Sequence, residues 1–272
     1  MSETSKIIEI RDLKKEYNEA SGSILRGLSF DVNPGDFIAV MGRSGCGKTT
    51  FLKILGLVLK KSSGTYLFRD RNIDDLWESE IADIRRREMG FVYQNYNLMQ
   101  SLTARENIEL PAVLDKTPQD KRSARCMSLM EEFGIAHLAE KYPYEMSGGE
   151  QQRVGICRAL INDPDLILAD EPTGNLDSVM GETVIRAFQR MNREMGKAVI
   201  IVTHDPEEAL TLSDRVLIIE GGSISQYAKP EEIVHQPKND FVRKFILNQL
   251  EIKRNNIYAL FGERPTLAVQ AG

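Results

Sequence analysis

Residues 37–49 read Phe37-Ile38-Ala39-Val40-Met41-Gly42-Arg43-Ser44-Gly45-Cys46-Gly47-Lys48-Thr49. The segment opens with a continuous apolar run, which is typical of a parallel strand buried on both faces. The rest matches G-x-x-x-x-G-K-[ST], in which the glycines let the backbone wrap closely around an anion with its N–H groups pointing inward. A helix over residues 48–58 should follow, with its positive N-terminus facing the anion. The segment therefore predicts a loop that binds the phosphates of a nucleotide.

The residues of this loop have distinct expected tasks. Lys48 should reach the β- and γ-phosphates, and Thr49 should place its hydroxyl on Mg²⁺. The other residues expected to cradle the nucleotide are Gly42, Arg43, Ser44, Gly45, Cys46, Gly47 and Thr50. We expect the Cys46 side chain to turn away from the phosphates, to react with thiol reagents and to be protected by nucleotide. The alternative for Cys46 is a redox switch.

Two later apolar strands end in polar residues that suit the same site. Residues 166–169 lead into Asp170, which is placed to hold Mg²⁺, and Glu171, which is placed to polarise the attacking water. These two carboxylates should point in different directions, because side chains alternate along a strand. Residues 199–203 lead into His204, expected at the γ-phosphate. Taken alone, the acidic pair at residues 170–171 could equally be the start of a solvated loop, and His204 could equally be a surface residue.

Length and composition describe one large α/β domain. The 272 residues are enough to bury a sizeable core without disulfides, and the net charge of −5 disfavours nucleic acid as the main partner. The three cysteines match no zinc or redox spacing. No secretory signal and no apolar run of roughly 20 residues is present. We therefore expect a cytoplasmic protein with reduced thiols, whose membrane part, if any, is supplied by another chain.

The order of strands and helices predicts a mostly parallel sheet with helices on its faces. Strands near residues 6–18 and 25–32 should pair antiparallel at the N-terminal side. A helical subdomain over about 70–162 should be inserted in a domain of residues 1–250. The last helix is expected over 240–250, and residues 251–272 are expected to form a tail. Ligands should bind at the carboxyl ends of the parallel strands.

A second glycine-rich segment narrows the class of nucleotide-binding protein. It reads Met146-Ser147-Gly148-Gly149-Glu150-Gln151-Gln152-Arg153. A serine and two glycines that open a helix let hydroxyl, amides and dipole bind an anion. The segment resembles the signature of the ATP-binding cassette (ABC) ATPases, usually LSGGQ. That resemblance implies a P-loop NTPase that hydrolyses MgATP as a head-to-tail dimer, in which Ser147, Gly148, Gly149 and Glu150 serve the partner's ATP. The alternative is an N-capped helix with a glycine turn.

Other positions are similar to that family from about Ile7 to Ala228. Tyr17 resembles the aromatic residue that stacks on adenine, Gln94 the glutamine that senses Mg²⁺ and the water, and Asp177 the residue that reaches across the dimer. The resemblance implies catalytic roles for Glu171, His204, Gln94 and Lys48, and Mg²⁺ contacts for Thr49, Gln94 and Asp170. Met146 replaces leucine and Glu150 replaces glutamine, and neither change should abolish activity.

Several segments resemble one branch of the family: the ATPases of macrolide exporters, lipoprotein-release systems and antimicrobial-peptide detoxification. They are residues 84–94, 97–99, 102–104, 106–111 and 170–178. Members of that branch pair with a separate membrane subunit and often perform mechanical work. The resemblance implies a homodimer at the cytoplasmic face of the membrane, with a permease contacting the region around Gln94–Leu98. Residues 229–242 resemble the tails of solute-importer ATPases instead.

Three functions are alternatives to an ATPase that drives a transporter. A non-transport ABC ATPase that regulates a membrane protein would carry the same motifs. A soluble member acting on DNA needs long coiled coils, for which the short segment between Gln94 and Ser147 leaves no room, and ribosome-acting members usually carry two cassettes. A P-loop kinase would have no reason to carry Ser147-Gly148-Gly149.

Overall fold

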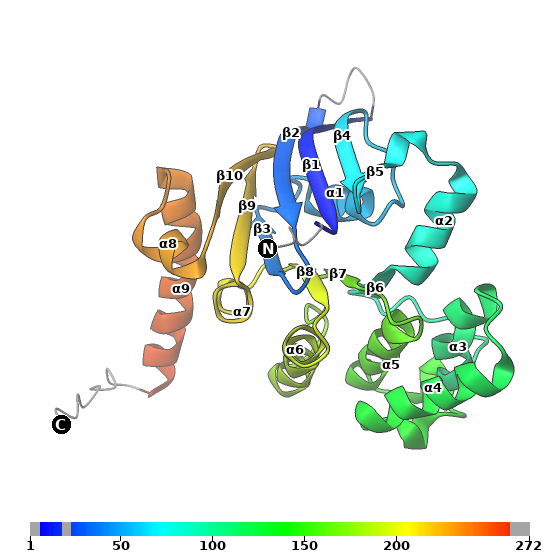
Figure 1. Ribbon diagram of the computed structural model, residues 1–272. Coiled ribbons are helices and arrows are strands. Elements are labelled where there is room, and N and C mark those ends of the chain that lie inside the picture. Colours follow the sequence, from blue (N-terminus) through cyan, green and yellow to red (C-terminus); the bar gives the residue numbers. More distant parts are fainter. Residues whose placement is uncertain (1–5, 18–22, 262–272) are drawn as a thin grey trace.

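The computed structural model describes residues 6–17 and 23–261 and is built on two β-sheets (Figure 1). The larger sheet has six strands in the order β10-β9-β3-β8-β7-β6. Its strands are parallel except β10, which pairs antiparallel with β9 at one edge. They are β3 (Phe37–Gly42), β6 (Met89–Tyr93), β7 (Leu166–Asp170), β8 (Ala198–Val202), β9 (Arg215–Glu220) and β10 (Ser223–Ala228). The predicted α/β class with a mostly parallel core is confirmed.

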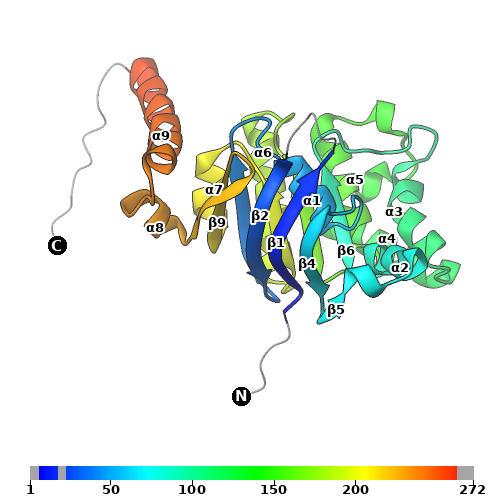
Figure 2. The ribbon, with the colours of Figure 1, turned by 90° about the horizontal axis from the view of Figure 1, so that it is seen from above.

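The smaller sheet is antiparallel and has the order β2-β1-β4-β5. Its strands are β1 (Ile8–Glu16), β2 (Ser23–Val32), β4 (Ser63–Phe68) and β5 (Arg71–Asn72). Figure 2 shows β1, β2 and β4 side by side on one face of the molecule. The N-terminal antiparallel strands expected from the sequence are thus present, and β4 and β5 extend them.

Alternation along β3 divides the interior into two hydrophobic cores. Ile38 and Val40 face a core shared with the small sheet and with α1 (Lys48–Leu55), which contributes the fully buried Phe51. Phe37, Ala39 and Met41 face the other core, which the helices after residue 103 cover. Because every β3 side chain is buried on one face or the other, the strand reads as a continuous apolar run. The start of the phosphate loop is therefore fixed from both sides of the sheet.

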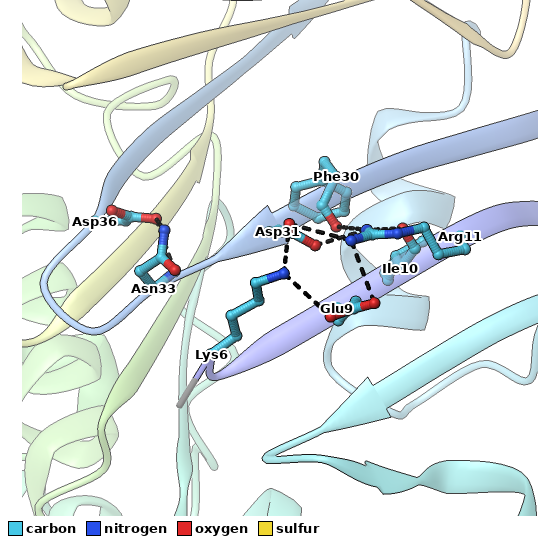
Figure 3. A network of polar contacts seen from close by, with 8 residues as sticks. All are labelled: Lys6, Glu9, Ile10, Arg11, Phe30, Asp31, Asn33 and Asp36. Atoms are coloured by element: carbon cyan, nitrogen blue, oxygen red, sulfur yellow. Dashed lines mark hydrogen bonds and ion pairs between the residues drawn. The ribbon is translucent and has the colours of Figure 1, made fainter. Parts of the chain in front are cut away.

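A polar network on the small sheet joins β1 to β2 (Figure 3). Asp31 accepts from Arg11 at 2.6 Å and pairs with Lys6 at 3.0 Å, while Glu9 contacts both cations. Burial alone would raise the pKa of Asp31, but the hydrogen bonds from Arg11 and Lys6 outweigh it and lower that pKa. Since the pairs are partly exposed, solvent screens them and they add little to the stability of the fold. The network fixes strand register more than it adds stability.

The helices flank the large sheet in two groups. Figure 1 shows α3, α4 and α5 beside β6, at the opposite end of the sheet from α8 and α9. The helices are α2 (Glu78–Arg87), α3 (Ala104–Leu114), α4 (Gln119–Glu132), α5 (Gly148–Leu160), α6 (Ser178–Arg193), α7 (Pro206–Leu212), α8 (Pro230–His235) and α9 (Asp240–Phe261). Within the described part of the chain, no helix is long and apolar enough to cross a membrane.

Two helices are longer than the sequence indicates. The sequence predicts a helix over 103–110, whereas α3 continues through Pro111 to Leu114, although proline removes a helical N–H. α9 continues to Phe261, into the segment expected as a tail. Val242 and Ile246 of α9 are buried against the core, so packing rather than intrinsic helix preference anchors its first turns. The division into a domain over 1–250, with a helical subdomain over 70–162, and a tail stays a prediction.

Asn107→Leu should lower the free energy of unfolding by about 2 kcal/mol or more, because several buried polar groups lose their partner. The Asn107 side chain is fully buried; it accepts from the Met99 N–H and donates to the carbonyls of Met99, Leu102 and Thr103. Urea unfolding measures the change, with the exposed Glu131→Gln as a control expected within about 0.5 kcal/mol of wild type. A variant as stable as wild type would contradict this assignment.

Candidate functional site

The carboxyl ends of four parallel strands meet at one edge of the large sheet. In the register, Tyr93 pairs with Asp170, Asp170 with Val202, and Val202 with Val40. The residues that follow these strand ends are therefore neighbours in space although they are far apart in the chain. A cavity of about 210 Å³ opens there, lined by Ile24, Ser44, Gly45, Gly47, Lys48, Thr49, Thr50, Glu171 and His204.

The phosphate loop needs glycine at two positions where the backbone passes close to other groups. A Cβ on Gly42 would collide with the Ile219 carbonyl and with the sulfur of Cys46. Gly47, with φ of 101°, is the N-cap of α1, and a Cβ there would lie 2.8 Å from Leu25. Any side chain would push the loop away from the sheet, so these glycines hold the loop against β9 and β2.

Lys48 folds back across the loop. Its ammonium donates to the carbonyls of Gly42 at 2.9 Å and Arg43 at 3.1 Å, and its side chain is 5% exposed. Both of these hydrogen-bond partners are neutral carbonyls, so an anion seated in the cavity would give the ammonium a direct counter-charge. Among the cavity residues, this is the strongest electrostatic attraction for a phosphate.

Thr49 and Asp170 form the candidate magnesium position. The Thr49 hydroxyl donates to Asp170 Oδ1 at 3.5 Å, so α1 and β7 bring two hard oxygen ligands together. Burial, and secondly the charge of Glu171, raise the pKa of Asp170 by more than the Thr49 hydrogen bond and the charges of Lys53 and Lys48 lower it. In the described ranges no group of three or more His, Cys, Asp or Glu is placed to hold a metal. These ligands fit Mg²⁺ that is completed by water and nucleotide phosphates.

Glu171 is held in a strained conformation at the end of β7. Its φ is 46°, its N–H donates to the Val202 carbonyl at 2.9 Å, and its Oε1 lies 2.8 Å from His204 Nε2. A left-handed backbone costs a non-glycine residue roughly 1–2 kcal/mol. Such strain persists only where the surroundings enforce it, often at functional sites.

Glu171 and His204 also border a second, larger cavity of about 560 Å³. Asp177, the N-cap of α6, lines this cavity together with Thr173 and Thr203. The Glu171–His204 pair therefore forms the wall between the phosphate cavity and a second open space.

The signature segment lies outside the phosphate cavity. Ser147 caps α5, and both its N–H and its hydroxyl donate to Glu150 Oε2, at 2.7 and 2.8 Å. These hydrogen bonds, the backbone one first, lower the pKa of Glu150. Gly148 and Gly149 occupy the first turn, which presents exposed Ser147 and the N–H groups of a helix start to solvent.

Other predicted positions are also absent from the lining of the phosphate cavity: Tyr17, Gly42, Arg43, Cys46, Gln94, Asp170 and Asp177. Tyr17 is 48% exposed with Lys15 over its ring at 5.1 Å. Gln94 follows β6, and its carbonyl accepts from Asn175 at 3.1 Å. Arg43 lies over the ring of Phe241 in α9 at 5.2 Å. The roles assigned to these residues stay predictions.

Sequence reasoning missed two residues that tie α5 to the loops around the site. Arg158 donates to the carbonyls of Tyr96 and Asn97, which both have positive φ. Gln152, fully buried, donates to the Pro172 carbonyl at 2.8 Å. Only their position on the helix that follows Ser147 could have drawn attention to them, because neither belongs to a recognisable motif.

Comparisons with known proteins agree on one family. The family model described as "ABC transporter" matches residues 25–174. The macrolide export ATP-binding/permease protein MacB of Syntrophobacter fumaroxidans is 40% identical over 255 residues, which cover 88% of this chain and 35% of MacB. The pyoverdine export ATP-binding/permease protein PvdT of Pseudomonas entomophila is 39% identical, covering 85% of this chain and 36% of PvdT. The chain spans about a third of the length of these relatives.

Solved structures give the same answer. The dimeric post-hydrolysis state of the ATP-binding cassette MJ0796 bound to ADP and Pi has a TM-score of 0.75 and 34% identity, covering 82% of this chain and 98% of MJ0796. A further dimeric structure of MJ0796, described as a bacterial ABC transporter cassette, has the same TM-score, the same coverage and 35% identity.

Asp170→Asn should raise the thermal unfolding midpoint of the nucleotide-free protein at pH 7. The raised pKa means that folding disfavours the ionised carboxylate, so removing the charge removes this cost. As the pH falls through the raised pKa, wild-type Asp170 becomes neutral and the two midpoints should converge. The same variant should lose the stabilisation that MgATP gives wild type, because Mg²⁺ loses a ligand.

Thermal unfolding with and without MgATP at pH 7, and of the nucleotide-free proteins from pH 8 down to about pH 4, near the ordinary pKa of an aspartate, measures both effects. The exposed Asp75→Asn serves as the control and should keep the MgATP stabilisation. If MgATP stabilised the Asp170 variant as much as wild type, the proposed magnesium position would be wrong.

Cys46 should be the thiol that reacts in the folded protein, and MgATP should slow its reaction at least about tenfold through burial of the loop. Cys126 and Cys157 are buried, whereas Cys46 is half-buried beside Gly42. Burial raises the pKa of Cys46 despite the opposing charge of Lys48, so reaction should be slow at pH 7 and accelerate with rising pH. Absorbance kinetics with a disulfide reagent measure this, and Cys46→Ser should abolish the phase. A rate indifferent to MgATP would place the nucleotide elsewhere.

Proposed function

The chain belongs to the ABC transporter family, and we propose that it is an ATP hydrolase of the exporter type that powers a membrane permease as one half of a head-to-tail dimer. Two MgATP would lie between the two chains. The transported molecule would be a peptide, a drug or a lipid-linked compound, or the work would be mechanical. The chain would lie at the cytoplasmic face of the membrane through its contact with the permease.

The observation that carries the proposal is the separation of two phosphate-binding helix starts in one chain. The N-terminus of α1 opens into the phosphate cavity, whereas the N-terminus of α5, with Ser147 and Gly148, does not line it. A second chain related by a two-fold axis would bring its α5 to this cavity and receive the same contact in return. The dimeric MJ0796 cassettes, to which this chain is similar over 98% of their length, support this arrangement.

The proposed chemistry follows from the positions of the cavity residues. Lys48 and the loop N–H groups would neutralise the phosphates, and Thr49 and Asp170 would hold Mg²⁺, which supplies positive charge to the leaving phosphate oxygens. Glu171 would accept a hydrogen bond from the attacking water and orient it in line with the γ-phosphate. His204, 2.8 Å from Glu171 Oε1, would hold that carboxylate in place and contact the γ-phosphate. Gln94 would complete the Mg²⁺ and water environment.

The permease contact is proposed for residues 94–98, next to β6. Tyr96 and Asn97 have φ of 60° and 48°, and Arg158 holds their carbonyls, so this loop is kept in one conformation. Leu98 is 8% exposed and belongs to the core, whereas Met99 is 49% exposed. The relatives named ATP-binding/permease proteins extend well beyond the region matched here, which supports a permease as partner. Absence of a nucleic-acid partner stays a prediction.

Glu171→Gln should reduce ATP turnover by roughly 10²–10⁴-fold, because a glutamine amide accepts the proton of the attacking water far less well than a carboxylate. The variant should still bind MgATP, since Lys48 and Thr49 are unchanged. Because the variant cannot hydrolyse the bound ATP, its two chains should remain associated as a dimer. Phosphate release measures turnover, and size-exclusion chromatography with light scattering measures the dimer.

The matched control is Glu182→Gln, an exposed glutamate of α6 that pairs with Arg186. It should turn over ATP as wild type does and show no trapped dimer. If ATP never joined two Glu171→Gln chains, the head-to-tail arrangement would be wrong. If the trapped dimer formed and co-purified with a membrane protein, the identity of that protein would narrow the substrate.

A further inference from the structure

Two threonines flank the catalytic pair proposed above. Thr173 lies two residues after Glu171, in the loop that follows β7. Thr203 directly precedes His204, at the end of β8, and is 3% exposed. The two threonines therefore belong to the segments that set the positions of Glu171 and His204.

Both threonine hydroxyls bind the same carboxylate. Thr173 Oγ1 donates to Glu208 Oε1 at 2.6 Å, and Thr203 Oγ1 donates to Glu208 Oε2 at 2.7 Å. One carboxylate oxygen of Glu208 thus binds the loop after β7, and the other binds the end of β8. Short hydrogen bonds to a charged acceptor are the strong ones, and this geometry uses both oxygens of one rigid, planar group.

The hydrogen bonds at the start of α7 explain why the Glu208 carboxylate can bind both threonines. Asp205 caps the helix by accepting from the Glu207 N–H, and Glu208 is the third helical residue. In a capping box the glutamate at this position would bind the backbone N–H of the cap. Here the Asp205 N–H instead donates to Thr203 Oγ1 at 3.0 Å, so Glu208 is available for the two threonines.

The hydrogen bonds to Glu208 help to hold the strained backbone of Glu171. Its left-handed backbone must be held by its surroundings. The Glu171 N–H donates to Val202, and the Glu171 carbonyl accepts from Gly174 at 3.1 Å. The hydrogen bond from Thr173 to Glu208 adds a third restraint, and it connects the Glu171 loop directly to the segment that carries His204.

We propose that Glu208 is a positioning residue that sets the distance between Glu171 and His204 and so aligns the attacking water. The inference rests on the roles proposed for Glu171 and His204. Glu208 itself lines the larger cavity and is absent from the lining of the phosphate cavity, so it acts through the two loops and not on the phosphates.

Glu208→Ala should lower kcat about 10–100-fold, since a displacement of about 1 Å at a reacting group costs on that order. The KM for ATP should change less than about 3-fold, because the phosphate cavity is untouched. Glu208→Gln should recover at least about a third of the wild-type kcat, because its carbonyl accepts one hydroxyl and its amide donates to the other threonine oxygen. Glu207→Gln, one residue earlier and exposed, is the matched control and should behave as wild type.

A double-mutant cycle separates positioning from general damage to the fold. In a Glu171→Gln background, Glu208→Ala should reduce the residual single-turnover rate less than about 3-fold, since the group that it positions is already gone. Thermal unfolding of each variant shows whether it is folded. The Thr173→Val and Thr203→Val variants should each reproduce part of the kcat loss.

The outcomes distinguish this inference from the proposed function. If Glu208→Ala lowered the rate equally in both backgrounds, or left kcat within about 3-fold of wild type, the positioning role would be overturned and the role of Glu171 would stand. If Glu171→Gln itself cost no activity, the proposed function of the pair would fall, and this inference with it.

Discussion

The parallel register of β6, β7, β8 and β3 is the constraint on which the rest of the structure depends. Backbone pairing places Tyr93, Asp170 and Val202 in one row, and the Thr203 N–H continues it by donating to the Val40 carbonyl at 3.2 Å. Asp170 lies in that row, and Glu171 and His204 follow it closely in the chain. A one-residue slip of any strand would exchange the two faces of its apolar side chains, so the two hydrophobic cores enforce the alignment of the site.

The stability of these cores allows the site to keep features that oppose folding. The ionised Asp170 is disfavoured by burial and by Glu171, Lys48 is buried among neutral carbonyls, and Glu171 has a left-handed backbone. The strained backbone costs on the order of 1 kcal/mol, against a net stability of 5–15 kcal/mol for a typical domain. A phosphate with its metal ion would compensate the charges of Lys48 and Asp170, so ligand binding would also stabilise the fold.

The sequence predicts the strands, the phosphate loop and the acidic strand ends because each depends on local pattern. The apolar run before Gly42 and the carboxylates after Ala169 belong to such patterns, and parallel pairing then brings them together. The hydrogen bonds from Thr173 and Thr203 to Glu208 are not predictable in this way, because contacts between a helix and two loops depend on side-chain positions in three dimensions. The extension of α9 to Phe261 is also absent from the prediction, which ends the last helix at residue 250.

Helix α5 connects the two halves of the proposed dimer site within one chain. Its first residues form the exposed signature, Gln152 in its second turn holds the Pro172 carbonyl beside Glu171, and Arg158 near its end holds the loop after Gln94. If the N-terminus of α5 were displaced, a rigid helix would move both loops together. In the proposed dimer, contact of the partner's phosphate with the signature would then reach both the carboxylate proposed to polarise the water and the loop proposed to contact a permease.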